Sequence, residues 1–259
     1  MIQIRREGPV AVIALDRAPV NALDPIMVSE LLDKFRESIA DSSVLGIVLT
    51  STHPSVFSSG FDLKALDPLP RSGFESFVQS FSSLARTMFS APKPVVAALT
   101  GHAIAGGCII ACFCDRVLLA EGKGTVGLSE ARLGVPIPGG CLEAVRYRLG
   151  ERALAEVVLG AQNHGAERAL ALGLVDQIVP APELLSSAVE LARTLGSHPG
   201  EAFANLKMNL RQPAIRLIDE AAASGVNDFV NAWFSAAARE ARTQLLDSLK
   251  KRAEPRNEN

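Results

Sequence analysis

Three short and predominantly apolar segments, separated by longer polar or helical stretches, constrain the fold of this chain most strongly. They cover residues 44–50, 94–99 and 117–120. Such segments are typical of strands in a parallel sheet that is covered on both faces, where helical crossovers join the strands. Helical periodicity dominates the chain from Arg152 onward. The pattern therefore predicts an α/β fold with a largely parallel sheet and a helical C-terminal third.

Local signals near the N-terminus add two elements. Residues 2–6 and 10–15 have the composition of strands and flank Glu7-Gly8-Pro9, which predicts a hairpin. Asp24 before Pro25 is typical of a helix N-cap followed by a proline in the first turn. An amphipathic run follows, so we predict a helix there.

Length and composition limit the organisation and the partners of the chain. With 259 residues, 48% of them apolar, it is long enough to bury one full core without a second independent domain. We predict a catalytic core over residues 1–181, a helical region over residues 182–252 and a flexible polar tail over residues 253–259. The formal net charge of −2 gives no general attraction to nucleic acid or to an anionic membrane, so we expect neither partner.

Other segments bear on location and on metals. No apolar run reaches the length of a membrane-spanning helix, and the first residues lack the features of a signal peptide, so we expect a cytoplasmic protein. Four cysteines lie in apolar context without paired His/Cys spacing, which favours buried thiols over a metal site. They are Cys108, Cys112, Cys114 and Cys141.

Two glycine-centred loops carry the chemically informative pattern. In residues 95–115 (VVAALTGHAIAGGCIIACFCD), a strand leads through a loop to Gly106 and Gly107 at the start of an apolar helix. The unpaired N–H groups at a helix N-terminus stabilise negative charge on a ligand oxygen. A glycine pair alone fits a tight strand-to-helix turn equally well. The second loop, VFSSGFDLK at residues 56–64, makes the combination more specific.

The two loops together resemble the signature of the crotonase (enoyl-CoA hydratase/isomerase) superfamily. Its pattern is approximately F-[SA]-[SA]-G-x-D-[IL]-K and G-x-A-x-G-G-G, and Ala105 stands where the first glycine of the triple is often found. Further segments follow in the order of the family, so the resemblance covers nearly the whole chain. They are DRAPVNALD, PKPVVAALTGHAIAGG, ARLGVPIPGG and ERALALGLVDQIVP.

The resemblance implies a fold, a substrate and an assembly. The fold is a ClpP-like spiral of ββα turns with a C-terminal helical region that mediates formation of a homotrimer or a dimer of trimers. The substrate is an acyl-CoA thioester, whose carbonyl oxygen is held between the backbone N–H groups of Phe61 and Gly106. CoA is then part of the substrate, and no separate cofactor is expected. The other residues implied to contact the substrate are Ser59, Gly60, Asp62, Leu63, Lys64 and Ile109.

Two basic residues have a further implied role. Lys64 corresponds to a partner of a CoA phosphate or of the adenine region, although a solvated surface lysine fits its position equally well. Lys207 corresponds to a residue that faces the CoA phosphates of a neighbouring subunit.

Two positions indicate the reaction. Hydratases of this family activate one water with two glutamates, which correspond here to Ile109 and Glu130. Isoleucine neither accepts a proton nor holds a water. A carboxylate that faces an apolar pocket, in contrast, has a raised pKa suited to a base that later returns its proton. One carboxylate with an oxyanion hole resembles the Δ3,Δ2-enoyl-CoA isomerases. The implied reaction moves a 3-enoyl-CoA double bond to the 2-trans position through a dienolate, with Glu130 carrying a proton from C2 to C4.

Alternatives remain open. Glu143 would add a second carboxylate for hydration, although an ion-paired structural role is favoured. A hydratase or a thioester hydrolase of the same family is the alternative, and a non-catalytic acyl-CoA-binding or RNA-associated protein is the distant one. For His102, a loop or packing role is favoured over catalysis. Trp233 and the phenylalanines of residues 74–81 suit core packing, with the acyl tunnel as the other possibility.

Overall fold

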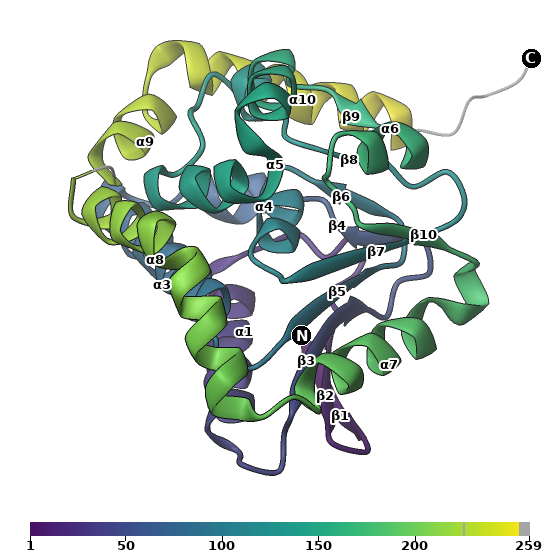
Figure 1. The fold of residues 1–259 in the computed structure, drawn as a ribbon. Coiled ribbons are helices and arrows are strands. Elements are labelled where there is room, and N and C mark those ends of the chain that lie inside the picture. The colour runs from purple at the N-terminus through teal and green to yellow at the C-terminus, as the bar shows by residue number, and fades with distance from the viewer. Residues whose placement is uncertain (225, 254–259) are drawn as a thin grey trace, which may run out of the picture.

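A six-stranded sheet runs through the computed structural model, which describes residues 1–224 and 226–253 (Figure 1). Its strands are β1 (Ile2–Glu7), β2 (Val10–Leu15), β3 (Gly46–Ser51), β5 (Val95–Leu99), β7 (Arg116–Ala120) and β10 (Gln177–Val179). The strand order is β1-β2-β3-β5-β7-β10, and every neighbouring pair is parallel except the β1–β2 hairpin. All residues of β3 and β5 are buried, which explains their apolar composition.

A second sheet of four short strands shows how the chain winds. Its strands are β4 (Val56–Ser58), β6 (His102–Ile104), β8 (Val126–Gly127) and β9 (Asn163–His164), in the order β4-β6-β8-β9. Three successive turns each place one strand in the larger sheet and the next in the smaller one: β3 then β4, β5 then β6, and β7 then β8. A helix follows each of these pairs, so the predicted ββα spiral is confirmed.

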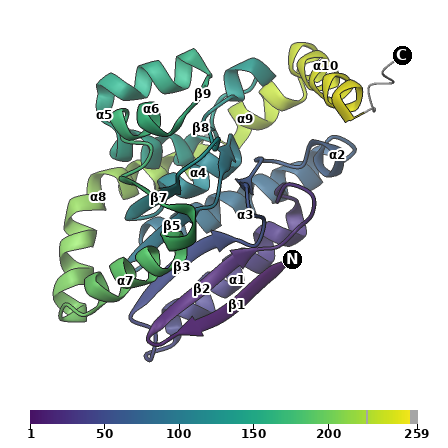
Figure 2. The same ribbon diagram turned by 90° about the vertical axis from the view of Figure 1, so that its right-hand side faces the viewer.

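Helices cover both faces of the larger sheet (Figures 1 and 2). They are α1 (Pro25–Ala40), α2 (Leu63–Leu66), α3 (Arg71–Phe89), α4 (Gly106–Cys112), the 3₁₀-helix η1 (Glu130–Leu133), α5 (Gly139–Gly160), α6 (Ala166–Ala171), the 3₁₀-helix η2 (Ala181–Glu183), α7 (Leu184–Gly196), α8 (Gly200–Ser224), α9 (Val226–Trp233) and α10 (Ala236–Ala253). α7 packs on one face, and the main core lies on the other face with α1, α3 and α4.

The predicted division of the chain at residue 181 stays a prediction. α7 begins beyond this boundary but packs against the larger sheet, whereas α8 packs chiefly on α5, and α9 on α3. Most of the predicted tail, residues 254–259, lies outside the described residues. Among the helices that the structure describes, none combines the length and the apolar character needed to cross a membrane.

The predicted hairpin and helix cap near the N-terminus are confirmed. β1 and β2 pair in register from Ile2 opposite Leu15 to Glu7 opposite Val10. α1 begins at Pro25, and the Asp24 carboxylate accepts a hydrogen bond from the backbone N–H of Met27 at 2.8 Å. The cap satisfies one of the N–H groups that a helix leaves unpaired in its first turn.

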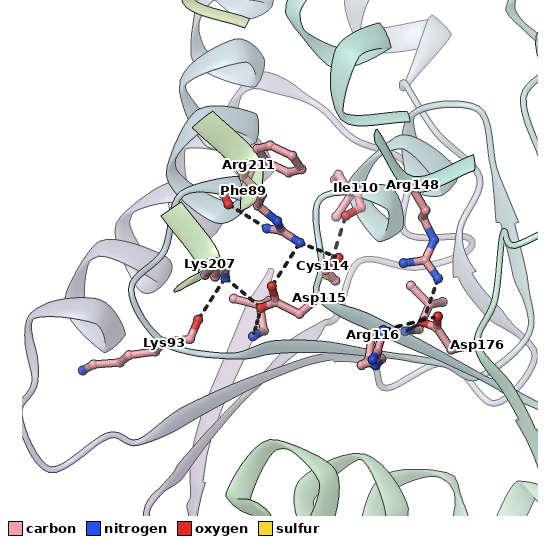
Figure 3. Close-up of polar contacts among 12 residues, drawn as sticks. Phe89, Lys93, Ile110, Cys114, Asp115, Arg116, Arg148, Asp176, Lys207 and Arg211 are labelled. Carbon is pink, nitrogen blue, oxygen red and sulfur yellow. Dashed lines mark hydrogen bonds and ion pairs between the residues drawn. The ribbon is translucent and has the colours of Figure 1, made fainter. Parts of the chain in front are cut away.

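A buried cluster of charged side chains joins α8 to the larger sheet (Figure 3). The carboxylate of Asp115, directly before β7, accepts hydrogen bonds from Lys207 Nζ and from the backbone N–H of Val95, both at 2.7 Å. Its other oxygen pairs with Arg211 Nη2 at 3.0 Å. Burial lowers the pKa of Lys207, which is only 6% exposed. The prediction that Lys207 faces CoA phosphates is therefore wrong, because its ammonium group is bound inside the protein.

Candidate active site

The two glycine-centred loops lie against each other in the structure. Gly60 and Phe61 follow β4, while Ala105 and Gly106 join β6 to α4. A Cβ atom built on Gly60 would lie 3.0 Å from the Gly106 nitrogen, and one built on Gly106 would lie 2.9 Å from the Phe61 ring. Any larger residue at either position would push the loops apart, so this close approach requires glycine.

The contact between these loops presents two backbone N–H groups. The chain on both sides of Phe61 is fixed, because Leu23 N–H donates to Gly60 O at 2.7 Å and Asp62 N–H donates to Leu23 O at 2.9 Å. The Phe61 N–H takes part in neither bond. Gly106 is the first residue of α4, where N–H groups have no acceptor within the helix. Both residues line one cavity, an arrangement that fits the predicted oxyanion hole.

Ala105, which precedes α4, has a backbone conformation that favours glycine. Its φ of 49° and ψ of −122° lie outside the regions that alanine normally occupies. Two backbone hydrogen bonds hold it there: its N–H donates to Gly127 O at 2.8 Å, and its carbonyl accepts from Ile109 N–H at 2.9 Å. Strain of this kind costs about 1–3 kcal/mol. With Ala105 in this conformation, the N-terminus of α4 faces the cavity, which Ala105 and Gly106 both line.

Glu130 is the first residue of η1, shortly after β8. The residue is 7% exposed, and its Oε2 has no hydrogen-bond partner within the part of the chain that the structure describes. Burial raises the pKa of Glu130 to about 7, and hydrogen bonds from backbone N–H groups of Ser129 and Glu130 oppose this rise only in part. A carboxyl group with such a pKa both accepts and returns a proton near neutral pH.

Glu130, Ile109 and the two loops line the same cavity, which has a volume of about 500 Å³. Ile109 projects from α4 and is 1% exposed. Among the described residues that line the cavity, Glu130 is the only carboxylate. The site therefore combines one base, two backbone donors and mainly apolar walls, which suits proton transfer on a polarised carbonyl compound.

The other predicted substrate contacts divide into two groups. Ser59 and Leu63 line the cavity, and Gly60, with a φ of 90°, permits the loop approach described above. Asp62 instead caps α2, where its Oδ1 accepts from the N–H of Lys64 at 3.0 Å, and its Oδ2 pairs with Arg17 at 2.6 Å. Neither Asp62 nor Lys64 belongs to the cavity lining, so a substrate contact for these two stays a prediction.

The C-terminal helices form a wall of the cavity, and the sequence indicated only Trp233 of this wall, as the less favoured alternative to core packing. Phe229 and Trp233 of α9, with Leu245 and Leu249 of α10, line the cavity. The guanidinium of Arg242 lies 4.0 Å from the Trp233 ring and donates to the backbone carbonyl of that residue at 2.8 Å. A sequence signal was present in α10, where Leu245 and Leu249 are four residues apart and so lie on one face of the helix.

Further side chains have the structural roles that were favoured from sequence. Glu143 pairs with Arg146 Nε at 3.3 Å and does not line the cavity. His102 lies on β6, where its Nδ1 is 2.9 Å from the Thr125 hydroxyl. Phenylalanines 74, 77 and 81 are core residues, whereas Trp233 also reaches the cavity. All four cysteines are buried and free.

Two polar residues of the cavity wall were also missed. Arg132 lies in η1 and Asn163 in β9, and both line the cavity. Arg132 is only two positions beyond Glu130, which was a usable signal. Asn163 reaches the site because β9 pairs with β8, and no motif marks that pairing in the sequence.

Comparison with known proteins defines the class of this chain. The enoyl-CoA hydratase/isomerase family model matches residues 5–253, so the chain belongs to that family, the crotonase family. Human mitochondrial enoyl-CoA delta isomerase 1 is 31% identical over 225 residues, which are 86% of this chain and 74% of that protein. Carnitinyl-CoA dehydratase of Escherichia coli K12 is 32% identical over 221 residues, which are 85% of this chain and 84% of that protein.

Solved structures agree with this assignment. The human mitochondrial Δ3-Δ2-enoyl-CoA isomerase superposes with a TM-score of 0.92 at 26% identity, covering 98% of this chain and 99% of that one. An enoyl-CoA isomerase from Mycobacterium tuberculosis gives a TM-score of 0.81 at 32% identity, covering 87% of this chain and 97% of that one. The chain is thus similar both to isomerases and, at the same level of identity, to a dehydratase.

Proposed function

We propose that the protein is a Δ3,Δ2-enoyl-CoA isomerase that uses Glu130 as its single acid–base group. One observation carries the proposal: Glu130 is the only carboxylate among the described residues of the cavity. By the family resemblance, Ile109 stands where a hydratase has its other glutamate. Similarity to the human mitochondrial enoyl-CoA isomerase supports the same reaction.

The geometry supports a proton shuttle. The thioester oxygen of a 3-enoyl-CoA accepts hydrogen bonds from Phe61 N–H and Gly106 N–H, which makes the C2 proton more acidic. Glu130 removes that proton and leaves a dienolate whose negative charge lies between the two donors. The protonated carboxyl group then gives the proton to C4, and the double bond moves to C2–C3. A pKa of about 7 suits both steps at neutral pH.

Hydration is the second candidate, because a carnitinyl-CoA dehydratase is 32% identical to this chain. Adding water across a double bond requires a group that activates the water and a group that protonates the neighbouring carbon. Glu143, which would have to be the other acid, pairs with Arg146 outside the cavity lining. Ile109 adds no polar atom. The site therefore favours isomerisation.

The proposal includes the substrate and the assembly. The substrate is an acyl-CoA thioester, and moving one proton within it requires no separate cofactor. A homotrimer or dimer of trimers and a cytoplasmic location stay predictions. Nucleic acid remains excluded as an expected partner on the ground of the net charge of −2.

The test compares 3-hexenoyl-CoA with 2-hexenoyl-CoA, followed through the absorbance of the conjugated enoyl thioester. We expect absorbance to appear with the 3-enoyl substrate and to persist with the 2-enoyl substrate. Glu130→Gln should abolish the first reaction while the variant still binds hexanoyl-CoA. Rapid loss of absorbance from 2-hexenoyl-CoA would identify a hydratase instead, and turnover by Glu130→Gln would rule out the single-base mechanism.

A further inference from the structure

The loop that carries Phe61 is bridged to the segment that precedes α1. Leu23 N–H donates to Gly60 O at 2.7 Å, and Asp62 N–H donates to Leu23 O at 2.9 Å, which makes a parallel bridge between Leu23 and Phe61. In a parallel ladder, the residue that lies between the two bonded groups directs its own N–H and C=O away from the neighbouring strand. The bridge therefore turns the Phe61 N–H away from Leu23.

Neighbouring N–H groups of the same loop are already bonded. Ser59 N–H donates to Val20 O at 3.1 Å, and Gly60 N–H donates to Ser58 Oγ at 3.2 Å. Among the residues that the structure describes, none accepts a hydrogen bond from the Phe61 N–H. Since Phe61 also lines the cavity, its N–H is the donor that this loop keeps free for a ligand oxygen.

A single side chain, that of Arg17, contacts both strands of this bridge. Its Nη1 donates to Ala22 O at 2.9 Å, and its Nη2 pairs with Asp62 Oδ2 at 2.6 Å, directly after Phe61. Nη2 also lies 3.2 Å from Asp24 Oδ2. The side chains of Arg17 and Asp62 are only 23% and 14% exposed, so solvent screens their pair less than one at the surface. A planar guanidinium with three such partners fixes the geometry of both strands.

Asp62 connects this contact to the donor loop. Its Oδ1 accepts from the N–H groups of Lys64 at 3.0 Å and Ala65 at 3.1 Å, at the start of α2, while Oδ2 is left for Arg17. Neither Asp62 nor Arg17 lines the cavity, so any effect of the pair on the reaction passes through the backbone of Phe61. Moving a group of the reacting site by about 1 Å lowers a rate about 10²-fold, so this fixation matters for catalysis.

We propose that Arg17 is a positioning residue for the oxyanion hole, and that its pair with Asp62 sets the direction of the Phe61 N–H. This inference deepens the proposed function and rests on it for the reaction. The carbonyl oxygen of a thioester gains most from a hydrogen bond when its negative charge develops, so a misdirected donor slows the reaction more than it weakens binding. The two effects are separable by experiment.

The first measurement compares turnover with binding in two variants. Arg17→Met removes the guanidinium, and Asp62→Asn keeps an oxygen for the α2 cap but turns an amide donor toward Arg17. We expect each variant to lower kcat for 3-hexenoyl-CoA about a hundredfold, while Kd for hexanoyl-CoA rises no more than about fivefold. Because both changes break the same pair, combining them should lower kcat by less than about twofold further.

A second measurement reports on the oxyanion hole without turnover. Infrared difference spectra of hexanoyl-CoA, isotopically labelled at its thioester carbonyl, give the C=O stretching frequency in the complex. Two donors lower this frequency relative to solution, and we expect each variant to lose about half of that shift or more. A role of Arg17 in stability alone leaves the shift of the folded protein unchanged. Arg86→Met breaks the exposed pair with Asp219, outside the cavity lining, and should retain both kcat and the shift.

Wild-type kcat in either variant would overturn the inference, and so would a lowered kcat with the full shift retained. If Arg17→Met does not fold, Asp62→Asn decides, because it leaves the guanidinium in place. A wild-type frequency equal to that in solution would reject the donor pair and this inference together. The shift requires no isomerisation, so its loss in the variants of a protein that does not isomerise 3-hexenoyl-CoA would uphold the positioning role and reject the proposed reaction. Isomerisation by wild type with unaffected variants would reject only the positioning role.

Discussion

The buried carboxylate of Glu130 determines how activity depends on pH. The group removes a proton only when it is ionised, and burial raises its pKa to about 7. We therefore expect kcat/KM for 3-hexenoyl-CoA to fall about tenfold for each pH unit below 7 and to level off above it. A pH–rate profile between pH 5 and pH 9 tests this. A plateau that extends down to pH 5 would show that the base is not held in an apolar site.

The same burial has a cost in stability. Because the folded-state pKa of Glu130 lies above its unfolded value, the free energy of unfolding falls as pH rises from about 4.5 to 7 and stays lower above pH 7. Glu130→Gln removes this titration, so the variant should exceed wild type by as much as about 3 kcal/mol at pH 8 and by much less at pH 4.5. Urea unfolding at both pH values measures the difference.

A matched substitution separates burial from charge removal. Glu167→Gln changes an exposed glutamate of α6 and should alter the free energy of unfolding by less than about 0.5 kcal/mol at either pH. If Glu130→Gln showed no more effect than this control at pH 8, the Glu130 carboxylate would not be desolvated.

Residues at motif positions were predictable, and residues brought in by folding were not. Phe61, Gly106, Ile109 and Glu130 stand at fixed places in recognisable segments, and the structure brings all four to one cavity. Leu245 lies more than a hundred residues from Glu130 in the chain. Its place in the cavity depends on how α8 and α9 fold back, which is a matter of packing that local sequence does not encode.

At the scale of elements, most strands of the larger sheet were predictable from the sequence, whereas those of the smaller sheet were not. β3, β5 and β7 were recognisable because each contains a run of apolar residues long enough to form a buried strand. The strands of the smaller sheet have two or three residues each, too few to show a period of two. They exist because neighbouring turns of the spiral satisfy their backbone hydrogen bonds.

Breaking the buried ion cluster that joins α8 to the larger sheet should strongly lower the free energy of unfolding. Asp115→Asn would leave the ammonium of Lys207 and the guanidinium of Arg211 buried without a carboxylate. We expect a loss of about 3–5 kcal/mol, because an unpaired buried charge is costly. Asp219→Asn breaks the exposed pair with Arg86 and should cost at most about 1 kcal/mol. Urea unfolding of both variants gives the comparison, and equal losses would contradict the burial of the cluster.

At the scale of the whole molecule, α8 presents an apolar stripe that lies about 100° around the helix from its buried charges. Leu206, Leu210 and Leu217 are 64%, 68% and 45% exposed, and their spacing of four and seven residues places them on one side of the helix. Lys207 and Arg211 follow two of these leucines directly and point to the core. An exposed apolar stripe of this kind is typical of a surface that contacts another protein chain.

This stripe supports the predicted self-association and makes it testable. Light scattering after size exclusion should give three or six times the 27.4 kDa chain mass. Replacing Leu206 and Leu210 together by lysine should lower the mass while the far-UV spectrum stays helical, because charged residues at a buried interface oppose association. Ile26→Lys, at an equally exposed position on α1, should leave the mass unchanged. A wild-type mass of one chain would reject the trimer, and an unchanged mass in the double variant would place the interface elsewhere.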